Sequence, residues 1–130
     1  MGDMQPYRPT AADVLSRYND EDLPDFCGIV LTDVNQSGLF DNFPLSVAAT
    51  RGDIDDIRAL LEGGAFVNAA GEHGCTALHD AVAQGNIAAV KILVEWGASL
   101  NLQDDFGDTP LDIARRRNSP ELLAVMERAL

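Results

Sequence analysis

Basic residues, cysteines and aromatic residues are all scarce in this 130-residue chain. Nine lysines and arginines stand against 21 aspartates and glutamates, and the resulting net charge of −12 argues against binding to nucleic acid or to an anionic membrane. Two cysteines, Cys27 and Cys75, are too few for a disulfide framework and are interpreted as reduced thiols. Aromatic residues make up 6% of the chain, and this low content suits small helices that pack closely together.

Long apolar runs are also missing from the sequence. No stretch approaches the roughly 18 apolar residues that read as a membrane span. The N-terminal residues show no apolar run behind a basic start, so no signal peptide is expected. Together these features predict a soluble, cytoplasmic protein, and the length is that of one folded domain.

Two short helical patterns, each followed by glycine, occupy residues 71–103. The first begins after Thr76 and ends at Gly85. The second begins at Asn86, which is a favoured helix-capping residue, and ends at Gly97. Each pattern is shorter than the roughly 12–15 residues that an isolated helix needs in water, so both helices must pack against another part of the chain.

A shift of 33 residues reproduces this pattern on both sides. The same shift aligns residues that favour helix starts, because Asp53, Asn86 and Ser119 precede the three second helices. Proline is tolerated in the first turn of a helix, and Pro44 and Pro110 fall there. The residues that repeat include Gly38, Leu45, Ala48, Gly52 and Asn68, matched by Gly71, Leu78, Ala81, Gly85 and Asn101, and in part by Leu111 and Ala114.

The 33-residue period of two helices and a turn, with T-A-L-H at residues 76–79 and T-P-L-D at residues 109–112, resembles the ankyrin repeat family. The resemblance covers about residues 33–130. It implies an all-α solenoid of stacked helix-turn-helix units joined by β-hairpin loops. The expected divisions are an N-terminal capping segment at 1–37 and repeats at 38–70, 71–103 and 104–130, the last with the C-terminal cap.

The first 41 residues carry three features that the repeat pattern does not explain. Thr10 is expected to cap a short helix together with Asp13. Residues 26–34 form an apolar run that is short enough for a strand or a buried helix, and periodicity does not decide between them. Asp41 stands where later units have glycine, which leaves room for another conformation at that hairpin tip.

Residues with metal-binding or catalytic side chains are better explained by structural roles. Thr76 and His79 match the Thr and His of the family's turn, and the resemblance implies that they hold it by local hydrogen bonds. His73 and Cys75 add two ligand types nearby, but a zinc site needs three or four converging ligands. No metal or cofactor is therefore expected. No catalytic motif or phosphate-binding loop is recognisable, so no enzyme activity is expected either.

The resemblance implies that a protein partner binds along the hairpin tips and the exposed side of the first helices. Phe40 and Phe106 fall on hairpin tips, where exposed aromatic residues suit binding anchors. The alternative is that each ring folds back onto its neighbouring repeat. By register, the candidate partner-binding residues are Leu39, Phe40, Asn42 and Arg51 in the first unit, Glu72, His73, Cys75, Asp80 and Gln84 in the second, and Asp105, Phe106, Asp108 and Arg116 in the third.

Acidic residues border these aromatic residues, which favours a partner that carries basic side chains around an apolar pocket. One hypothesis is a non-catalytic cytoplasmic inhibitor, similar to the short ankyrin proteins that act as immunity partners of secreted toxins. Opposite charge would speed its association with a basic partner such as a toxin. The alternative hypothesis is a scaffolding or regulatory subunit that positions an enzyme. The chain itself is expected to be a monomer or a weak oligomer.

Overall fold

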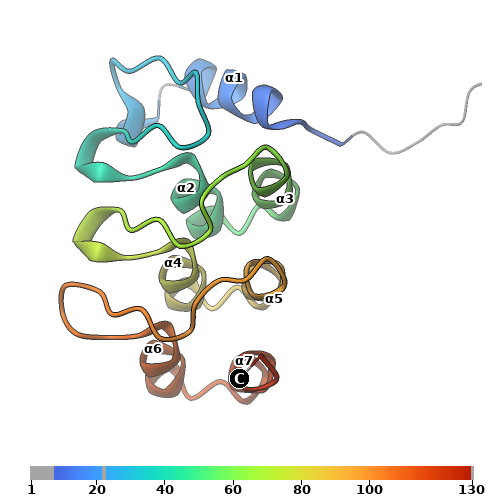
Figure 1. Ribbon diagram of the computed structural model, residues 1–130, viewed down its shortest axis with the longest axis vertical. Coiled ribbons are helices and arrows are strands. Elements are labelled where there is room, and N and C mark those ends of the chain that lie inside the picture. The colour runs from blue at the N-terminus through green and yellow to red at the C-terminus, as the bar shows by residue number, and fades with distance from the viewer. Residues whose placement is uncertain (1–7, 22, 130) are drawn as a thin grey trace, which may run out of the picture.

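The computed structural model describes residues 8–21 and 23–129, and also leaves the side chain of Phe40 outside the description (Figure 1). Within these residues the chain forms α-helices and short 3₁₀ helices. The α-helices are α1 (Ala11–Glu21), α2 (Pro44–Arg51), α3 (Ile54–Glu62), α4 (Ala77–Gln84), α5 (Ile87–Glu95), α6 (Pro110–Arg117) and α7 (Pro120–Glu127). The 3₁₀ helices are η1 (Pro24–Phe26), η2 (Leu39–Asp41) and η3 (Glu72–Gly74).

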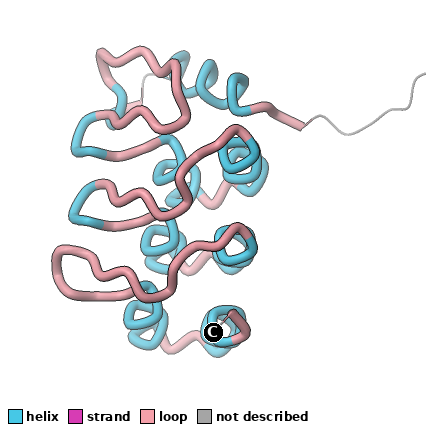
Figure 2. Tube along the Cα trace, in the orientation of Figure 1, coloured by secondary structure: helices cyan, strands magenta, loops and turns pink. Residues whose placement is uncertain are grey.

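The helices stack in two columns. Figure 1 shows α2, α4 and α6 one below another, with α3, α5 and α7 beside them and three hairpin-shaped loops projecting on the far side of the first column. Helix α1 continues the second column above α3. No residue in the described ranges is in a strand (Figure 2). The predicted β-hairpin loops are instead turns whose first two tips are the 3₁₀ helices η2 and η3, and the third hairpin consists of loop residues. The predicted all-α solenoid of paired helices is confirmed.

Side chains at the helix starts explain where these helices begin. The carboxylate of Asp53 accepts a hydrogen bond from the backbone N–H of Asp56, and Asn86 caps α5 in the same way. The ends of the first helices are equally well defined. Gly85 and Asn118 close α4 and α6 with φ of 71° and 55°, and asparagine is the residue that most readily replaces glycine in this left-handed conformation.

The segment before the first repeat takes neither form considered for residues 26–34. After η1 the backbone continues as turns and loop, although Leu31 is buried. Gly28, with φ of 76°, interrupts any regular element. The side chain of Asn19 in α1 holds the loop instead, because its oxygen accepts from Leu31 N–H at 2.7 Å and its amide donates to Leu31 C=O at 3.0 Å. Thr10 and Asp13 cap α1 reciprocally, as predicted.

The core lies between the columns and between successive repeats. Leu45, Leu78 and Leu111 repeat at the same position of α2, α4 and α6, and all three are buried. Leu60 and Leu93 do the same in the second column. Burying one such leucine side chain contributes about 1.5–3 kcal/mol. Because neighbouring repeats share these contacts, each repeat depends on the one beside it.

A buried carboxylate attaches α1 to α3. Asp56 accepts two hydrogen bonds from the guanidinium of Arg17, at 2.5 and 3.1 Å, and a third from the hydroxyl of Tyr18 at 3.1 Å. Burial and the nearby Asp56 raise the pKa of Tyr18, so its hydroxyl stays protonated and keeps donating. These three groups place α1 over the first repeat.

Candidate protein-binding surface

Each hairpin loop is closed by one backbone hydrogen bond at the same position of the repeat. The N–H groups of Gly38, Gly71 and Asp104 donate to the C=O groups of the residues four positions later, Asn42, Cys75 and Asp108, over 2.7–2.8 Å. Asp41 has φ of 62°, close to the 70° of Gly74, so the first hairpin keeps the left-handed conformation that glycine takes one repeat later. Aspartate is one of the few residues that tolerate it.

Hydrogen bonds between hairpins hold them side by side. The side-chain oxygen of Asn42 accepts from the backbone N–H of Glu72 at 3.1 Å, and its amide donates to Asp25 at 3.1 Å. One repeat later the backbone N–H of Asp105 donates to His73 C=O at 2.9 Å. Asn42 and Asp105 were both predicted to bind a partner, and both also fix the spacing of the hairpins.

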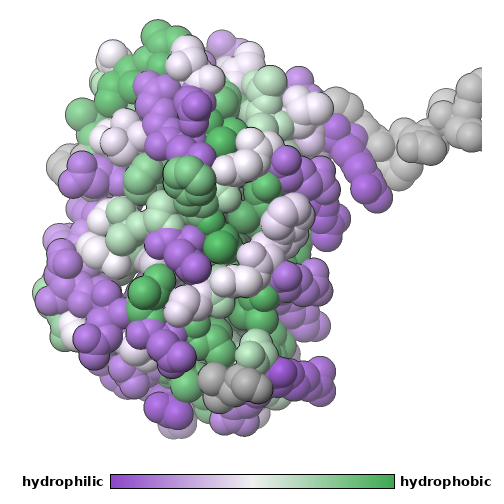
Figure 3. All heavy atoms as spheres, in the orientation of Figure 1, coloured by the Kyte–Doolittle hydropathy of each residue, from purple (hydrophilic) through white to green (hydrophobic). Residues whose placement is uncertain are grey.

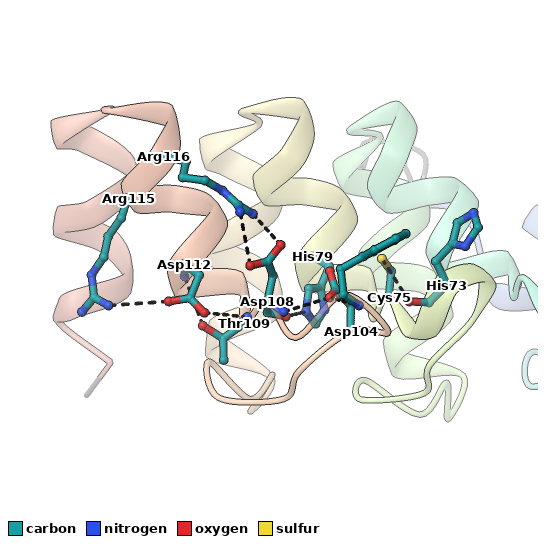
Figure 4. Close-up of polar contacts among 10 residues, drawn as sticks. His73, Cys75, His79, Asp104, Asp108, Thr109, Asp112, Arg115 and Arg116 are labelled. Atoms are coloured by element: carbon teal, nitrogen blue, oxygen red, sulfur yellow. Dashed lines mark hydrogen bonds and ion pairs between the residues drawn. The ribbon is translucent and has the colours of Figure 1, made fainter.

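His79 joins the second repeat to the third. Its Nδ1 accepts from the N–H of Thr76 at 3.1 Å, so the ring carries its proton on Nε2, which donates to Asp108 C=O at 2.9 Å. In Figure 4 the imidazole lies beside Asp108. Both ring nitrogens are used in this way, and the histidine is 1% exposed. The structural role that the turn motif implied for Thr76 and His79 is confirmed.

Within the third repeat two candidate residues pair with each other. The guanidinium of Arg116 donates to both carboxylate oxygens of Asp108, at 3.2 and 2.7 Å (Figure 4). This contact raises the pKa of Arg116. Arg117 extends back to the second repeat and donates to Ala83 C=O at 2.7 Å. The chain thus supplies its own cation to the carboxylate of the last hairpin.

A groove with a volume of about 460 Å³ lies between the first two repeats. Its floor and walls come from η1, α2, α4 and the first two hairpins. Six of the predicted binding residues line it, namely Asn42, Arg51, Glu72, His73, Cys75 and Asp80. Leu39, Gln84, Asp105, Phe106, Asp108 and Arg116 do not line this groove.

Negative charge accumulates in this groove and changes the protonation of the groups in it. Burial raises the pKa of Asp80 to about 7, and the carboxylates of Glu72 and Asp25 add to the rise. Burial also raises the pKa of the Cys75 thiol to about 11, with Asp80 contributing. Cys75 is therefore a protonated thiol at neutral pH, which makes it a poor nucleophile and metal ligand.

Arg51, the one predicted cationic residue of the first unit, is engaged by the N-terminal segment. Its guanidinium contacts Glu21 at 2.7 Å and lies 5.4 Å from the centre of the Tyr18 ring. The hydrogen bond to Glu21 raises its pKa. Arg51 therefore ties α2 to α1 at the edge of the groove.

The third hairpin exposes a large aromatic side chain, as one of the two sequence interpretations expected. The ring of Phe106 is 75% exposed, and its only ring neighbour in the described chain is His73, 5.7 Å away between centroids. The hairpin edge of the molecule is otherwise largely hydrophilic (Figure 3). Leu39 and Gln84 are also exposed. The ring of Phe40 lies outside the described residues, so its predicted role as an anchor has no structural account.

Metal-ligand residues do not gather in the part of the chain that the structure describes. No three His, Cys, Asp or Glu side chains there could hold a metal ion together. His73 and His79 lie apart in Figure 4, with His79 beside Asp108. The same described ranges contain no helix that is long and apolar enough to cross a membrane.

The groove also contains residues that were not among the sequence candidates, and two of them, Ser46 and Asp25, bear on its chemistry. Ser46 lies in α2 at the position that His79 holds in α4, and Asp25 comes from η1 in the N-terminal segment. The 33-residue register shows that serine replaces histidine at this position of the first unit, and this replacement could have drawn attention to Ser46. Asp25 lies outside the repeat register, so the period carried no signal for it.

Helix pairs that repeat every 33 residues, with a projecting hairpin between pairs, define a helical-repeat solenoid. A family model described as Ankyrin repeats (3 copies) matches residues 15–104, which is more than half of the chain. The chain belongs to the ankyrin repeat family, whose repeats form protein–protein interaction modules. A search of curated proteins finds no match to this chain.

Proposed function

We propose that this chain is a non-catalytic inhibitor that binds a basic protein through its hairpins and the exposed side of α2, α4 and α6. The observation that carries the proposal is the ring of Phe106, which is 75% exposed at a hairpin tip beside two acidic residues, Asp104 and Asp105. Large exposed aromatic side chains dominate binding energy when they enter a pocket on a partner. The acidic residues suit basic side chains at the rim of such a pocket.

The net charge of −12 supports a basic partner. Opposite charge accelerates encounter and disfavours acidic proteins. A basic substrate cleft, such as that of a toxin acting on nucleic acid, would be blocked by an acidic surface of this size. In its most specific form the proposal is a cytoplasmic immunity protein that neutralises such a toxin.

The first test compares partner capture by the native chain, by Phe106→Ala and by Phe66→Ala. Phe66 is a matched control because its ring is 67% exposed but lies on a different loop. We expect one basic protein to be retained by the native chain and by Phe66→Ala, and to be lost at least tenfold with Phe106→Ala. Thermal melts should be alike for all three. Equal retention by Phe106→Ala would refute the hairpin site.

A second measurement separates an inhibitor from a scaffold. The activity of the captured protein is measured with increasing amounts of the native chain. Inhibition that saturates at a 1:1 ratio is expected for the proposed function. Unchanged or raised activity in the complex would favour the scaffolding alternative instead.

A further inference from the structure

We propose that the groove between the first and second repeats receives one lysine or arginine side chain of the protein partner. The inference rests on the proposed function, because it specifies which chemical group of the partner this surface takes up. The groove volume of about 460 Å³ far exceeds the ~30 Å³ that one water occupies in the liquid. It therefore has room for the stem and the charged end of one basic side chain.

Three carboxylates reach the groove from different segments. Asp25 lies in η1, Glu72 in η3 and Asp80 in α4. The Asn42 amide donates to Asp25 at 3.1 Å and to Glu72 at 3.4 Å, which orients both side chains. Among the described residues nothing donates a hydrogen bond to the carboxylate of Asp80 or forms an ion pair with it. This half-buried group is the one left for an incoming cation.

The basic groups that line the groove are already engaged. The Arg51 guanidinium pairs with Glu21 at 2.7 Å. The His73 imidazole lies 3.5 Å from Glu72 and also contacts the Phe106 ring. The remaining ionisable group facing Asp80 is the thiol of Cys75, whose raised pKa keeps it uncharged at neutral pH. The carboxylate of Asp80 is therefore left without a cationic partner among the described residues.

A buried hydroxyl points to the same ligand independently. Ser46 is 4% exposed, and its hydroxyl has no hydrogen-bond partner among the described residues. Every fully inaccessible polar side-chain atom in those residues is paired, so this hydroxyl must open onto the groove that Ser46 lines. A hydroxyl oxygen accepts a hydrogen bond from an ammonium or guanidinium group. Buried polar groups are normally satisfied, and the charged end of a bound basic side chain would satisfy this one.

The third repeat shows how the chain satisfies a hairpin carboxylate when it supplies its own arginine. Arg116 on α6 forms a two-pronged contact with Asp108. The residues in register with Arg116 are Ala83 on α4 and Thr50 on α2, neither of which carries a charge. The groove therefore lacks the internal arginine of the last repeat, and a partner's basic side chain would take the corresponding role.

The walls of the groove suit the rest of such a side chain. Leu23, Pro24 and Val47 provide an apolar surface on which the methylene stem of lysine or arginine packs while its charged end reaches the carboxylates. Because burial, Glu72 and Asp25 raise the pKa of Asp80 to about 7, binding of a cation would release a proton near neutral pH. Binding should therefore weaken as the pH falls from 8 to 6.

The test uses the full chain, labelled for NMR, and three capped tripeptides Gly-X-Gly in which X is arginine, lysine or citrulline. Citrulline has the shape of arginine without its charge. At pH 8 we expect the NMR signals of Ser46, Thr50 and Asp80 to shift saturably with the arginine or the lysine peptide, and not to shift with the citrulline peptide. Asp80→Asn should weaken binding at least fivefold. Glu95→Gln removes one charge from the exposed end of α5 and should leave binding unchanged.

A second readout is the carboxyl signal of Asp80, whose titration midpoint in the native chain should fall when the arginine or lysine peptide is bound. The assignment is overturned if neither basic peptide shifts the NMR signals of the groove residues. It is also overturned if the citrulline peptide binds as well as the arginine peptide, or if Glu95→Gln weakens binding as much as Asp80→Asn. Any of these results could occur while Phe106→Ala still loses the partner. In that case the groove assignment fails and the proposed function stands.

Discussion

At the scale of single residues, one register position has three different roles in three repeats. His79 bridges to the next hairpin through Asp108 C=O. Asp112 accepts from Thr109 N–H at 3.0 Å, which lowers the pKa of its carboxyl and completes the cap of α6. Ser46 has no bonding partner among the described residues and opens onto the groove. The first repeat, in which the side chain at this position makes no structural contact, is thus the one that contributes to the candidate groove.

Asp80 should make the protein less stable at high pH than it would otherwise be. Its pKa of about 7 in the folded chain lies above the ordinary value of 3.8. The folded state therefore binds the proton more tightly than the unfolded state, so this group destabilises the fold above pH 7. The penalty disappears as the pH falls from about 7 to about 4. The fold is therefore less stable at the pH values at which the carboxylate that lines the groove is ionised.

Asp80→Asn should accordingly stabilise the chain at pH 8 by on the order of 1–3 kcal/mol, since one unit of pKa shift corresponds to about 1.4 kcal/mol and the carboxyl is partly exposed. The check is urea unfolding of both chains at several values between pH 4 and 8. The difference in unfolding free energy should shrink toward zero at pH 4. A difference that is independent of pH would show that Asp80 ionises normally.

At the scale of elements, the attachment of α1 depends on an asymmetric ion pair. The side chain of Arg17 is 42% exposed, whereas that of Asp56 is 1% exposed. Removal of the arginine would leave a buried carboxylate with only the Tyr18 hydroxyl as its side-chain partner. Removal of the carboxylate leaves a guanidinium that can turn to water. The two truncations should therefore differ in cost.

We expect Arg17→Ala to cost about 3–5 kcal/mol, the usual penalty for an unpaired buried charge. Asp56→Ala should cost less, about 1–3 kcal/mol, mainly for the unsatisfied Tyr18 hydroxyl. Denaturant unfolding of the two variants gives the order directly. The double variant should be more stable than Arg17→Ala alone, and the opposite order would mean that α1 is held by its apolar contacts instead.

Close packing of α1 on the end of α3 provides a second test at this scale. Gly63 has φ of −81°, which any residue adopts, but a Cβ there would collide with the Cβ of Ala11. Gly97 has φ of 88° with open space around it, so alanine there meets only backbone strain of about 1–2 kcal/mol. Both substitutions should destabilise the chain, for different reasons.

The steric clash at Gly63 and the backbone strain at Gly97 can be distinguished by adding the substitution Ala11→Gly to each variant. We expect this change to rescue Gly63→Ala and to leave the cost of Gly97→Ala unchanged, as measured by thermal or denaturant unfolding. Rescue of neither variant would mean that α1 does not lie against Gly63 in solution.

At the scale of the whole molecule, periodicity explains what the sequence could predict. The 33-residue register located the repeat helices and their caps, including Asn118 in place of glycine, because those features recur in every unit. The contact between Arg17 and Asp56 joins residues 39 positions apart and occurs once, so no period pointed to it. The groove depends on Asp25, which lies before the first full repeat, and for the same reason only part of it was predicted.

A stack of repeats should lose cooperativity where a contact between neighbours is removed. His79 is such a contact, because its Nε2–H bonds to the third hairpin and its Nδ1 caps α4. His79→Ala should cost about 1–3 kcal/mol for the unsatisfied backbone groups. It should also let α6 and α7 open separately from the rest, since solenoid stability is a sum of repeat and interface contributions.

Ser46→Ala is the matched control, because it truncates the same register position one repeat earlier, where the hydroxyl has no partner in the described chain. Native-state hydrogen exchange distinguishes the two variants. In His79→Ala the amides of α6 and α7 should exchange faster than those of α2 to α5, whereas Ser46→Ala should exchange as the native chain does. Uniformly faster exchange in His79→Ala would show that the chain unfolds as one cooperative unit, and the interface at His79 would then stabilise all the repeats together.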